Sequence, residues 1–362
     1  MTRMKRLLIA AICALASAAS ATAQTASPYP APVERDFTVR NFAFESGETL
    51  PEIKLHYRTV GQPRKDADGV VRNGILILHG TGGTGRGFLN EAFAGRLFGK
   101  GQLYDAERYF VILPDNIGHG DSTKPSDGLR MKFPNYRYVD MVRLQHKLVT
   151  EGLGLSRLHV VTGTSMGGMH TWMWGYLYPD FIDALVPLAS NPVEIAGRNR
   201  VWRKLLVDAV TSDPTWKNGN YTEPPRGMAS ALGFLLMATS VPLQWQKDFA
   251  TAQQADKWLA DQIASRTKTT DANDMLYYFR ASEDYDPSPH LAKITAPLLA
   301  INSADDFVNP PELPMMETLI KKVKRGRFIL LPITDETRGH GTHSRPAVWG
   351  AQLAEFLATV RK

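Results

Sequence analysis

The chain has 362 residues, of which 43% are hydrophobic and 22% are charged, and its formal net charge at neutral pH is +6. Three of the positive charges, on Arg3, Lys5 and Arg6, lie in a short N-terminal segment, and the charge of about +3 that remains argues against a nucleic-acid partner. The single cysteine, Cys13, lies in the same segment. The rest of the chain must therefore be stabilised by a large hydrophobic core and not by disulfides.

The N-terminal segment has the three parts of a secretory signal peptide. After the basic start, an apolar run extends from Leu7 to about Ala19, and a small-x-small cleavage site ends at Ala23. The apolar run is too short to span a bilayer, so no stable membrane anchor is expected. We therefore expect residues 1–23 to be removed and the protein to be exported, either to the periplasm or out of the cell.

Two stretches with alternating polarity open the folded region, at residues 37–44 and 53–60. In the second stretch Leu55, Tyr57 and Thr59 alternate with polar or charged neighbours. Alternation of this kind is typical of an antiparallel pair that is half exposed to solvent.

Uninterrupted apolar runs follow, and a loop and a predicted helix come after each of the first three. The expected strands are residues 74–78, 109–115, 158–162, 184–189, 296–301 and 327–333, and an amphipathic helix is expected at 346–360. Strands without alternation are buried on both faces, as in a parallel sheet covered by helices. The pattern predicts an α/β fold with a mostly parallel sheet and helices on both faces.

Residues 191–287 interrupt the alternation of strands and helices. This interval is rich in Trp, Met and Pro and reads as helices joined by turns. Because its apolar residues need a surface to pack on, we expect a helical lid inserted above the carboxyl ends of the strands. The predicted core then consists of two parts, residues 24–190 and 288–362.

The candidate nucleophile is Ser165, in the sequence Gly163-Thr164-Ser165-Met166-Gly167. An apolar strand precedes this Gly-x-Ser-x-Gly motif and a helix is expected to begin near Met166. Such a strand-turn-helix holds its serine in a cramped backbone conformation at the carboxyl end of a sheet, and the two glycines remove Cβ atoms that would clash there.

A serine hydroxyl needs a histidine base and an acid that fixes the tautomer of the histidine. In the strand-turn-helix hydrolase arrangement they follow in the order serine, acid, histidine. Asp305 and Asp306 both follow the strand that ends near residue 301, and we favour Asp306 because it lies four residues before Pro310.

Two histidines, His340 and His343, follow the last expected strand. We favour His340, because its loop lies at a distance from the final helix that suits a reach back over the sheet. The His-x-x-His spacing also suggests a metal site, but nothing nearby supplies a third ligand, so no metal is expected.

The glycine-rich loop at residues 79–83 is the candidate second half of an oxyanion hole. The backbone N–H groups of Thr81 and Met166 are the expected donors to the negative charge that develops on a carbonyl oxygen. The loop lacks the Gly-x-Gly-x-x-Gly register and no Gly-Lys-Ser/Thr follows it, so a nucleotide site is discounted and no cofactor is expected.

With these residues in place, the chain resembles the α/β-hydrolase superfamily, and within it the homoserine O-acetyltransferase group and its esterase relatives. The resemblance extends from about Leu55 to the C-terminus. It is carried by Gly163 to Met169, by Asp306 with Pro310-Pro311, by Gly339-His340, and by residues 212–221, which are similar to the Asp-Pro-x-Trp-x-x-Gly-x-Tyr of that group. The resemblance implies a covalent acyl-serine intermediate and no metal.

Two departures from that group argue against homoserine as the acyl acceptor. The acid that directly follows the catalytic histidine in the group, and that suits an ammonium group, is Gly341 here. The arginine-bearing lid segment of the group is Ala229 to Leu232 here. The expected signal peptide would also separate the protein from cytoplasmic acetyl-CoA, which leaves water as the acceptor.

The sequence therefore predicts an exported serine hydrolase that cleaves a small-molecule carboxylic ester. The runner-up is an acyltransferase that uses the same acyl-enzyme. A catalytically inactive binding protein would need a broken triad, whereas every position is filled here. The sequence does not indicate an oligomeric state.

Overall fold

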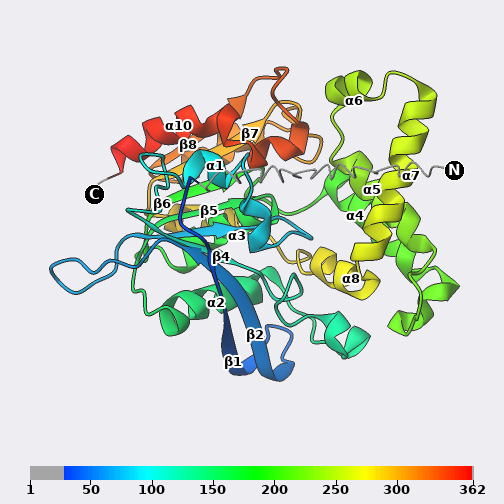
Figure 1. Ribbon diagram of the computed structural model, residues 1–362, viewed down its shortest axis with the longest axis horizontal. Coiled ribbons are helices and arrows are strands. Elements are labelled where there is room, and N and C mark those ends of the chain that lie inside the picture. The colour runs from blue at the N-terminus through cyan, green and yellow to red at the C-terminus, as the bar shows by residue number, and fades with distance from the viewer. Residues whose placement is uncertain (1–27, 361–362) are drawn as a thin grey trace, which may run out of the picture.

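The computed structural model describes residues 28–360, so the predicted signal peptide, residues 1–23, lies outside the described residues. Eight strands form one sheet in the order β1-β2-β4-β3-β5-β6-β7-β8 (Figure 1). Their bounds are β1 Val33–Ala43, β2 Thr49–Val60, β3 Gly74–Leu78, β4 Phe110–Pro114, β5 Leu158–Thr164, β6 Ile182–Leu188, β7 Leu298–Ser303 and β8 Gly326–Leu331. The expected α/β class is confirmed.

The alternating stretches form the expected antiparallel pair, because β1 pairs antiparallel with β2, with Phe37 opposite Leu55. β2 pairs antiparallel with β4, and every other pairing in the sheet is parallel. The last strand is shorter than expected and ends at Leu331. Pro332 follows it and has no N–H to donate to the sheet, and Ile333 is exposed.

Helices cover both faces of the sheet, as the continuous apolar strands predict. On one face lie α2 (Tyr138–Lys147) and α3 (Met166–Leu177), and on the other lie α1 (Ala94–Leu97) and α10 (Pro346–Thr359) (Figure 1). The short helix α9 (Met315–Leu319) packs into the same core as α2 and α3. Each face has its own hydrophobic core, and the five residues of β3 and of β4 are buried throughout. The sheet is therefore a rigid platform for the loops at its carboxyl edge.

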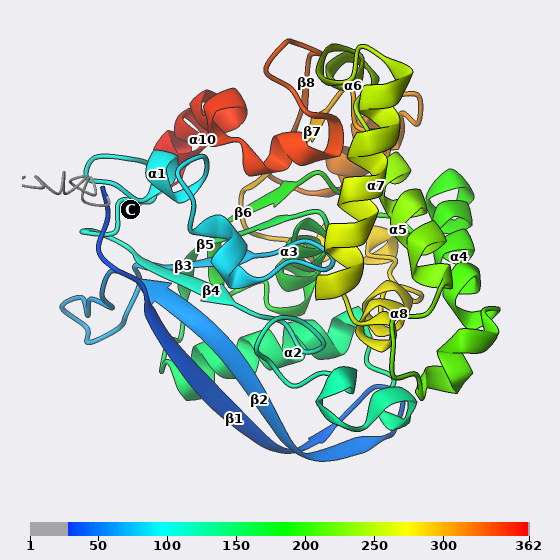
Figure 2. The same ribbon diagram turned by 45° about the vertical axis from the view of Figure 1, so that its right-hand side comes forward.

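Five further helices lie between β6 and β7, and we call residues 197–280 the cap. They are α4 (Gly197–Thr211), α5 (Gly227–Ala238), α6 (Pro242–Asp248), α7 (Ala252–Thr269) and α8 (Ala272–Arg280). Both ribbon views show these helices grouped together on one side of the sheet, beyond the ends of its strands (Figure 1, Figure 2). Within residues 28–360 no single helix is long and apolar enough to cross a membrane; α5 and α6 pass that test only as a pair, bent by 111°.

The Asp-Pro-x-Trp stretch ties the cap together. Asp213 accepts a hydrogen bond from the N–H of Gly227, the first residue of α5. The indole N–H of Trp216 donates to the side chain of Asn273 at 3.0 Å, and the Tyr221 hydroxyl donates to Asp271 at 2.6 Å. Because Asn273 lies in α8 and Asp271 caps it, these contacts join the turn after α4 to α5 and α8.

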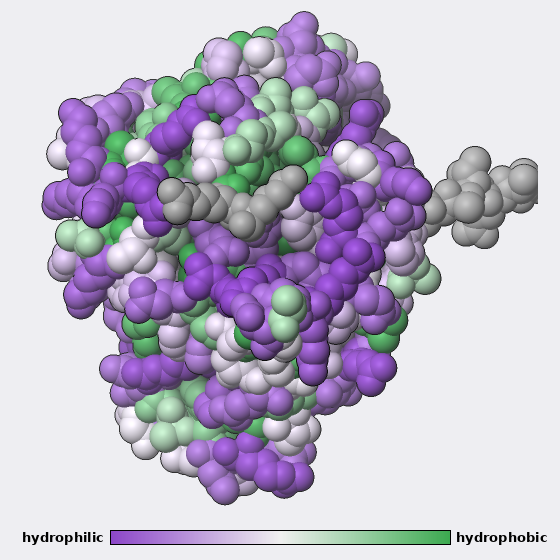
Figure 3. Space-filling view, turned by 90° about the vertical axis from the view of Figure 1, so that its left-hand side faces the viewer, coloured by the Kyte–Doolittle hydropathy of each residue, from purple (hydrophilic) through white to green (hydrophobic). Residues whose placement is uncertain are grey.

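The face of the molecule that lies away from the cap is mostly hydrophilic, with apolar residues interspersed among the hydrophilic ones (Figure 3).

Candidate active site

Ser165 stands at a sharp turn between β5 and α3. Its φ is 54° and its ψ is −114°, a left-handed conformation that a side chain adopts only where the surroundings enforce it. A Cβ on Gly163 would collide with the carbonyl oxygen of Gly167, and a Cβ on Gly167 would collide with that of Leu78. The two glycines are therefore required for the turn to sit against β3.

The structure brings Ser165, His340 and Asp306 into one hydrogen-bonded chain. Nε2 of His340 lies 2.7 Å from Oγ of Ser165, and Nδ1 of His340 lies 2.9 Å from the Asp306 carboxylate. His340 comes from the turn Gly339–Ser344 after β8, and Asp306 from the loop after β7. The three side chains thus come from three strand ends that are distant in sequence.

Asp306 is fully buried and needs several donors to remain ionised. Burial alone would raise its pKa, but the His340 imidazole, the Asn309 amide and the N–H of Val308 hold the pKa of this carboxyl below its ordinary value of 3.8. Asn309 and Val308 donate at 3.0 and 2.8 Å. A carboxylate held in this way fixes the proton of His340 on Nδ1 and leaves Nε2 free to accept from Ser165.

The two alternative residues are placed differently. Asp305 accepts from the Ser303 hydroxyl and makes no hydrogen bond to a histidine among the described residues. The ring of His343 packs edge-on against His340, with ring centres 5.2 Å apart. Burial and the neighbouring His340 lower the pKa of His343 to about 3, so this imidazole is neutral at physiological pH.

The loop after β3 passes beside the nucleophile. A Cβ on Gly80 would lie 3.3 Å from the Cβ of Ser165. The N–H of Asn116 donates to Nε2 of His79, so this buried imidazole carries its proton on Nδ1, which lies 2.9 Å from the Gly80 carbonyl oxygen. The Gly80 carbonyl and the Thr81 N–H belong to the same trans peptide group and point in opposite directions. Because the carbonyl faces His79, the Thr81 N–H points away from His79.

The predicted oxyanion donors are Thr81, which lines the same cavity as Ser165, and Met166. Met166 directly follows Ser165 as the first residue of α3. Within residues 28–360 neither backbone N–H donates to a backbone acceptor. Both are free to donate to a ligand.

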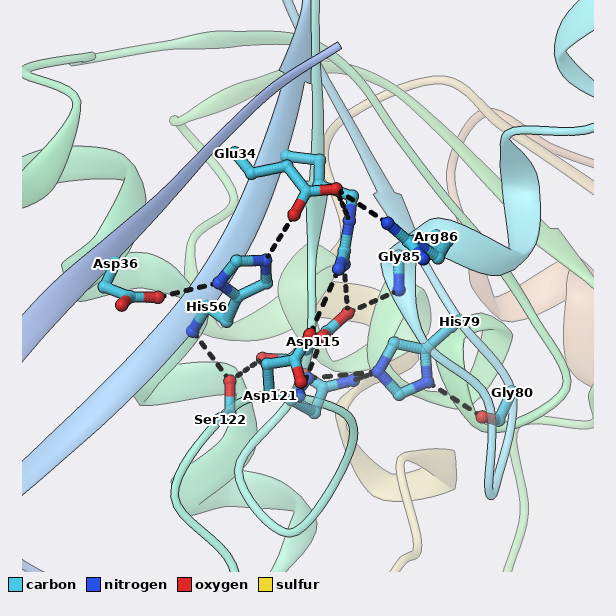
Figure 4. A network of polar contacts seen from close by, with 12 residues as sticks. Glu34, Asp36, His56, His79, Gly80, Gly85, Arg86, Asp115, Asp121 and Ser122 are labelled. Atoms are coloured by element: carbon cyan, nitrogen blue, oxygen red, sulfur yellow. Dashed lines mark hydrogen bonds and ion pairs between the residues drawn. The ribbon is translucent and has the colours of Figure 1, made fainter. Parts of the chain in front are cut away.

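An ion-pair network anchors the same loop from below (Figure 4). Asp115 accepts from the N–H of Gly85 at 2.7 Å and from the Arg58 guanidinium at 3.0 Å. Side-chain oxygen and nitrogen atoms of His56, Asp115 and Asp121 come within 4.8 Å of one another, the spacing of a metal site. However, Arg58 already donates to the carboxylates of Asp115 and Asp121, so we interpret the network as an ion-pair cluster that holds the loop in place.

A cavity of about 290 Å³ lies above Ser165, between the carboxyl edge of the sheet and the cap. The strand-end loops contribute Thr81, Ser165 and His340 to its wall, and cap helices α4, α5, α7 and α8 contribute the roof. Sequence reasoning did not identify two arginines in this roof, Arg203 and Arg266.

The signal for Arg203 was present in the pattern of α4. Leu206 and Val210 form the buried stripe of this helix, and Arg203 lies one turn earlier on the same stripe. A charged residue at a core position of an amphipathic helix is an exception that requires a local reason.

The chain resembles known proteins in sequence. Residues 73–329 match the family described as the alpha/beta hydrolase fold. A homoserine O-acetyltransferase of Moorella thermoacetica is 30% identical over 74% of this chain and 80% of its own length. A probable acyltransferase of Methanothermobacter thermautotrophicus is 29% identical over 79% of this chain and 87% of its own length.

Solved structures share the architecture at lower sequence identity. Esterase E22 superposes with a TM-score of 0.79 at 21% identity, over 90% of this chain and all of that one. Homoserine O-acetyltransferase from Bacillus anthracis superposes with a TM-score of 0.78 at 21% identity, over 91% of this chain and 99% of its own. Likeness at this identity extends to the fold alone, and the same fold carries proteins described as hydrolases and as transferases.

Proposed function

The chain belongs to the alpha/beta hydrolase fold family and is related to homoserine O-acetyltransferases and esterases, and from that premise we propose that it is a serine hydrolase acting on a carboxylic ester. The single observation that carries the proposal is the contact of 2.7 Å between His340 Nε2 and Ser165 Oγ. This is the distance at which a general base takes a proton from a nucleophile.

In the proposed reaction Ser165 Oγ attacks the ester carbonyl and His340 accepts its proton. The N–H groups of Thr81 and Met166 donate to the oxygen that becomes negative. When the intermediate collapses, the C–O bond to the alcohol breaks and His340 returns the proton to the departing alcohol. An acyl-serine remains, and Asp306 keeps the imidazolium of each step paired with a negative charge.

Deacylation requires an acceptor, and we propose that it is water. His340 removes a proton from the water as its oxygen attacks the acyl-serine, and then returns a proton to Ser165 as the acid leaves. Gly341 offers no carboxylate beside His340 to hold an ammonium group, and an apolar stretch of α5 stands where the related group carries an arginine. Export, which the N-terminal leader favours, belongs to the same proposal because it would remove the protein from acetyl-CoA.

The acyltransferase reading is the second candidate, since curated relatives are described as acetyltransferases. We expect the purified protein, given p-nitrophenyl acetate with millimolar homoserine or butanol, to release mainly free acetate. The reason is that none of the described residues lining the cavity is acidic, so no carboxylate is placed there to hold the ammonium group of an amino-acid acceptor. Product analysis by NMR measures the ratio of acetate to acetylated acceptor.

A panel of esters graded by acyl length, run beside that experiment, controls for a poor choice of donor. If the acetylated acceptor dominates at low acceptor concentration, the protein is an acyltransferase and the proposed hydrolysis is wrong.

A further inference from the structure

Arg203 is a buried cation without an anionic partner. Only 4% of its surface is exposed. Its Nε donates to the Asn199 amide at 2.9 Å and its Nη1 to the Ser282 hydroxyl at 3.2 Å, and both acceptors are neutral. No carboxylate of the described residues lies within 4.0 Å of the guanidinium, although burying an unpaired charge is costly.

Other donors around Arg203 also lack an acceptor. The indole N–H of Trp202 and the hydroxyls of Tyr138 and Thr81 are buried and have no hydrogen-bond partner among the described residues. Burial raises the pKa of the Tyr138 phenol, while the charge of Arg203 and the nearby Ser282 and Thr81 hydroxyls act in the opposite direction. Trp202 and Arg203 can only donate, so the group that satisfies this cluster must accept.

The cluster borders the cavity that contains the nucleophile. Arg203, Trp202 and Thr81 line the same cavity as Ser165, and Arg266 of α7 adds a second positive charge. None of the described residues in that wall is acidic. The guanidinium also lies over the Trp202 and Phe279 rings, 4.9 and 5.4 Å from their centres, which holds its plane in place.

We propose that Arg203, supported by Trp202 and Tyr138, binds a carboxylate of the substrate, so that the ester carries a negative charge on its acyl or its alcohol part. The inference rests on the proposed function, because it names the class of ester that the same site takes. Arg203 comes from α4 and not from residues 229–232, where related proteins carry their arginine. With Gly341 beside His340, the site suits a carboxylate without a neighbouring ammonium.

Two matched pairs of esters test this proposal and separate the two possible positions of the charge. The first pair is the p-nitrophenyl ester of hexanoic acid and the p-nitrophenyl monoester of adipic acid. The second pair is the acetyl ester of butanol and the acetyl ester of γ-hydroxybutyrate. The quantity measured is the ratio of kcat/KM for the charged ester to kcat/KM for its neutral partner.

We expect a ratio of about 10 or more in one pair for the wild-type protein, since a hydrogen bond to a charged group discriminates by roughly ten- to hundredfold. Arg203→Met should lower that ratio about ten- to hundredfold, and Arg203→Lys should lower it less, because lysine keeps the charge but not the planar fork. The matched control is Arg200→Met, an exposed arginine of the same helix near Glu283, which should keep the wild-type ratio.

A wild-type ratio near 1 in both pairs, or a ratio that Arg203→Met leaves unchanged, would overturn the inference. If Arg203→Met fails to fold, as judged by its Tm, the Arg203→Lys ratio decides.

Labelling of Ser165 by a fluorophosphonate keeps the two claims apart. Labelled protein without a charge preference refutes the inference alone, and protein that is neither labelled nor active refutes the proposed function. If the protein is neither labelled nor active, the binding of monomethyl adipate and of methyl hexanoate to Ser165→Ala is measured by calorimetry. Tighter binding of monomethyl adipate supports the inference, and equal binding of the two esters refutes it.

Discussion

Replacing Ser165 with alanine should lower kcat for a short acyl ester by roughly 10⁴- to 10⁶-fold, because the acyl-enzyme route is lost and only binding and the oxyanion donors remain. The fold should survive, since alanine keeps the Cβ that the turn at φ 54° already accommodates. Hydrolysis of p-nitrophenyl acetate under saturating conditions, with Tm measured on the same preparation, gives both quantities.

The matched control is Ser230→Ala, an exposed serine of α5 outside the catalytic cavity, for which we expect wild-type turnover. If Ser165→Ala kept turnover within a few-fold of the wild-type value, the assignment of the nucleophile would be wrong.

Replacing Asp306 with asparagine should lower kcat about 10⁴-fold, as the loss of the corresponding acid does in serine hydrolases. The reason is the tautomer of His340. An asparagine amide can donate to Nδ1, which moves the imidazole proton to Nε2 and leaves no acceptor for the Ser165 hydroxyl. The asparagine oxygen still accepts from the N–H of Val308, so the loop should keep its shape.

Asp305→Asn provides the control on the neighbouring residue. Among residues 28–360, the Asp305 side chain accepts only from the Ser303 hydroxyl, two residues earlier. We expect the Asp305→Asn variant to lose less than about tenfold in kcat, since it removes no contact to His340. A severe effect of Asp305→Asn together with a mild effect of Asp306→Asn would transfer the role of the acid to Asp305.

The local parts of this site could be predicted because they depend on neighbouring residues. Gly163 and Gly167 are spaced for a turn that tolerates no Cβ at either position, and the structure shows which carbonyl oxygen each would strike. Ser165, Asp306 and His340 each follow a strand that is largely apolar in sequence. Such strands end at one edge of a parallel sheet, which brings distant residues together.

What could not be predicted depends on contacts across the fold. The buried stripe of α4 marks Arg203 as unusual, but its entry into the catalytic cavity depends on how α4 packs against α5 and α8. The contact that orients the oxyanion loop also joins residues that are distant in sequence. His79 follows β3, whereas Asn116, which donates to it, follows β4. The choice between Asp305 and Asp306 likewise depended on loop conformation, which sequence spacing only suggests.

The most direct test of the account is to trap the acyl-enzyme. The protein is mixed with p-nitrophenyl acetate, quenched in acid within one turnover, and analysed by intact mass and peptide mapping. We predict a single acetyl group on Ser165, absent from Ser165→Ala and accumulating in proportion to the first burst of nitrophenol. Turnover at the normal rate with no acetyl group on Ser165, or with the acetyl group on another residue, would contradict the proposed mechanism.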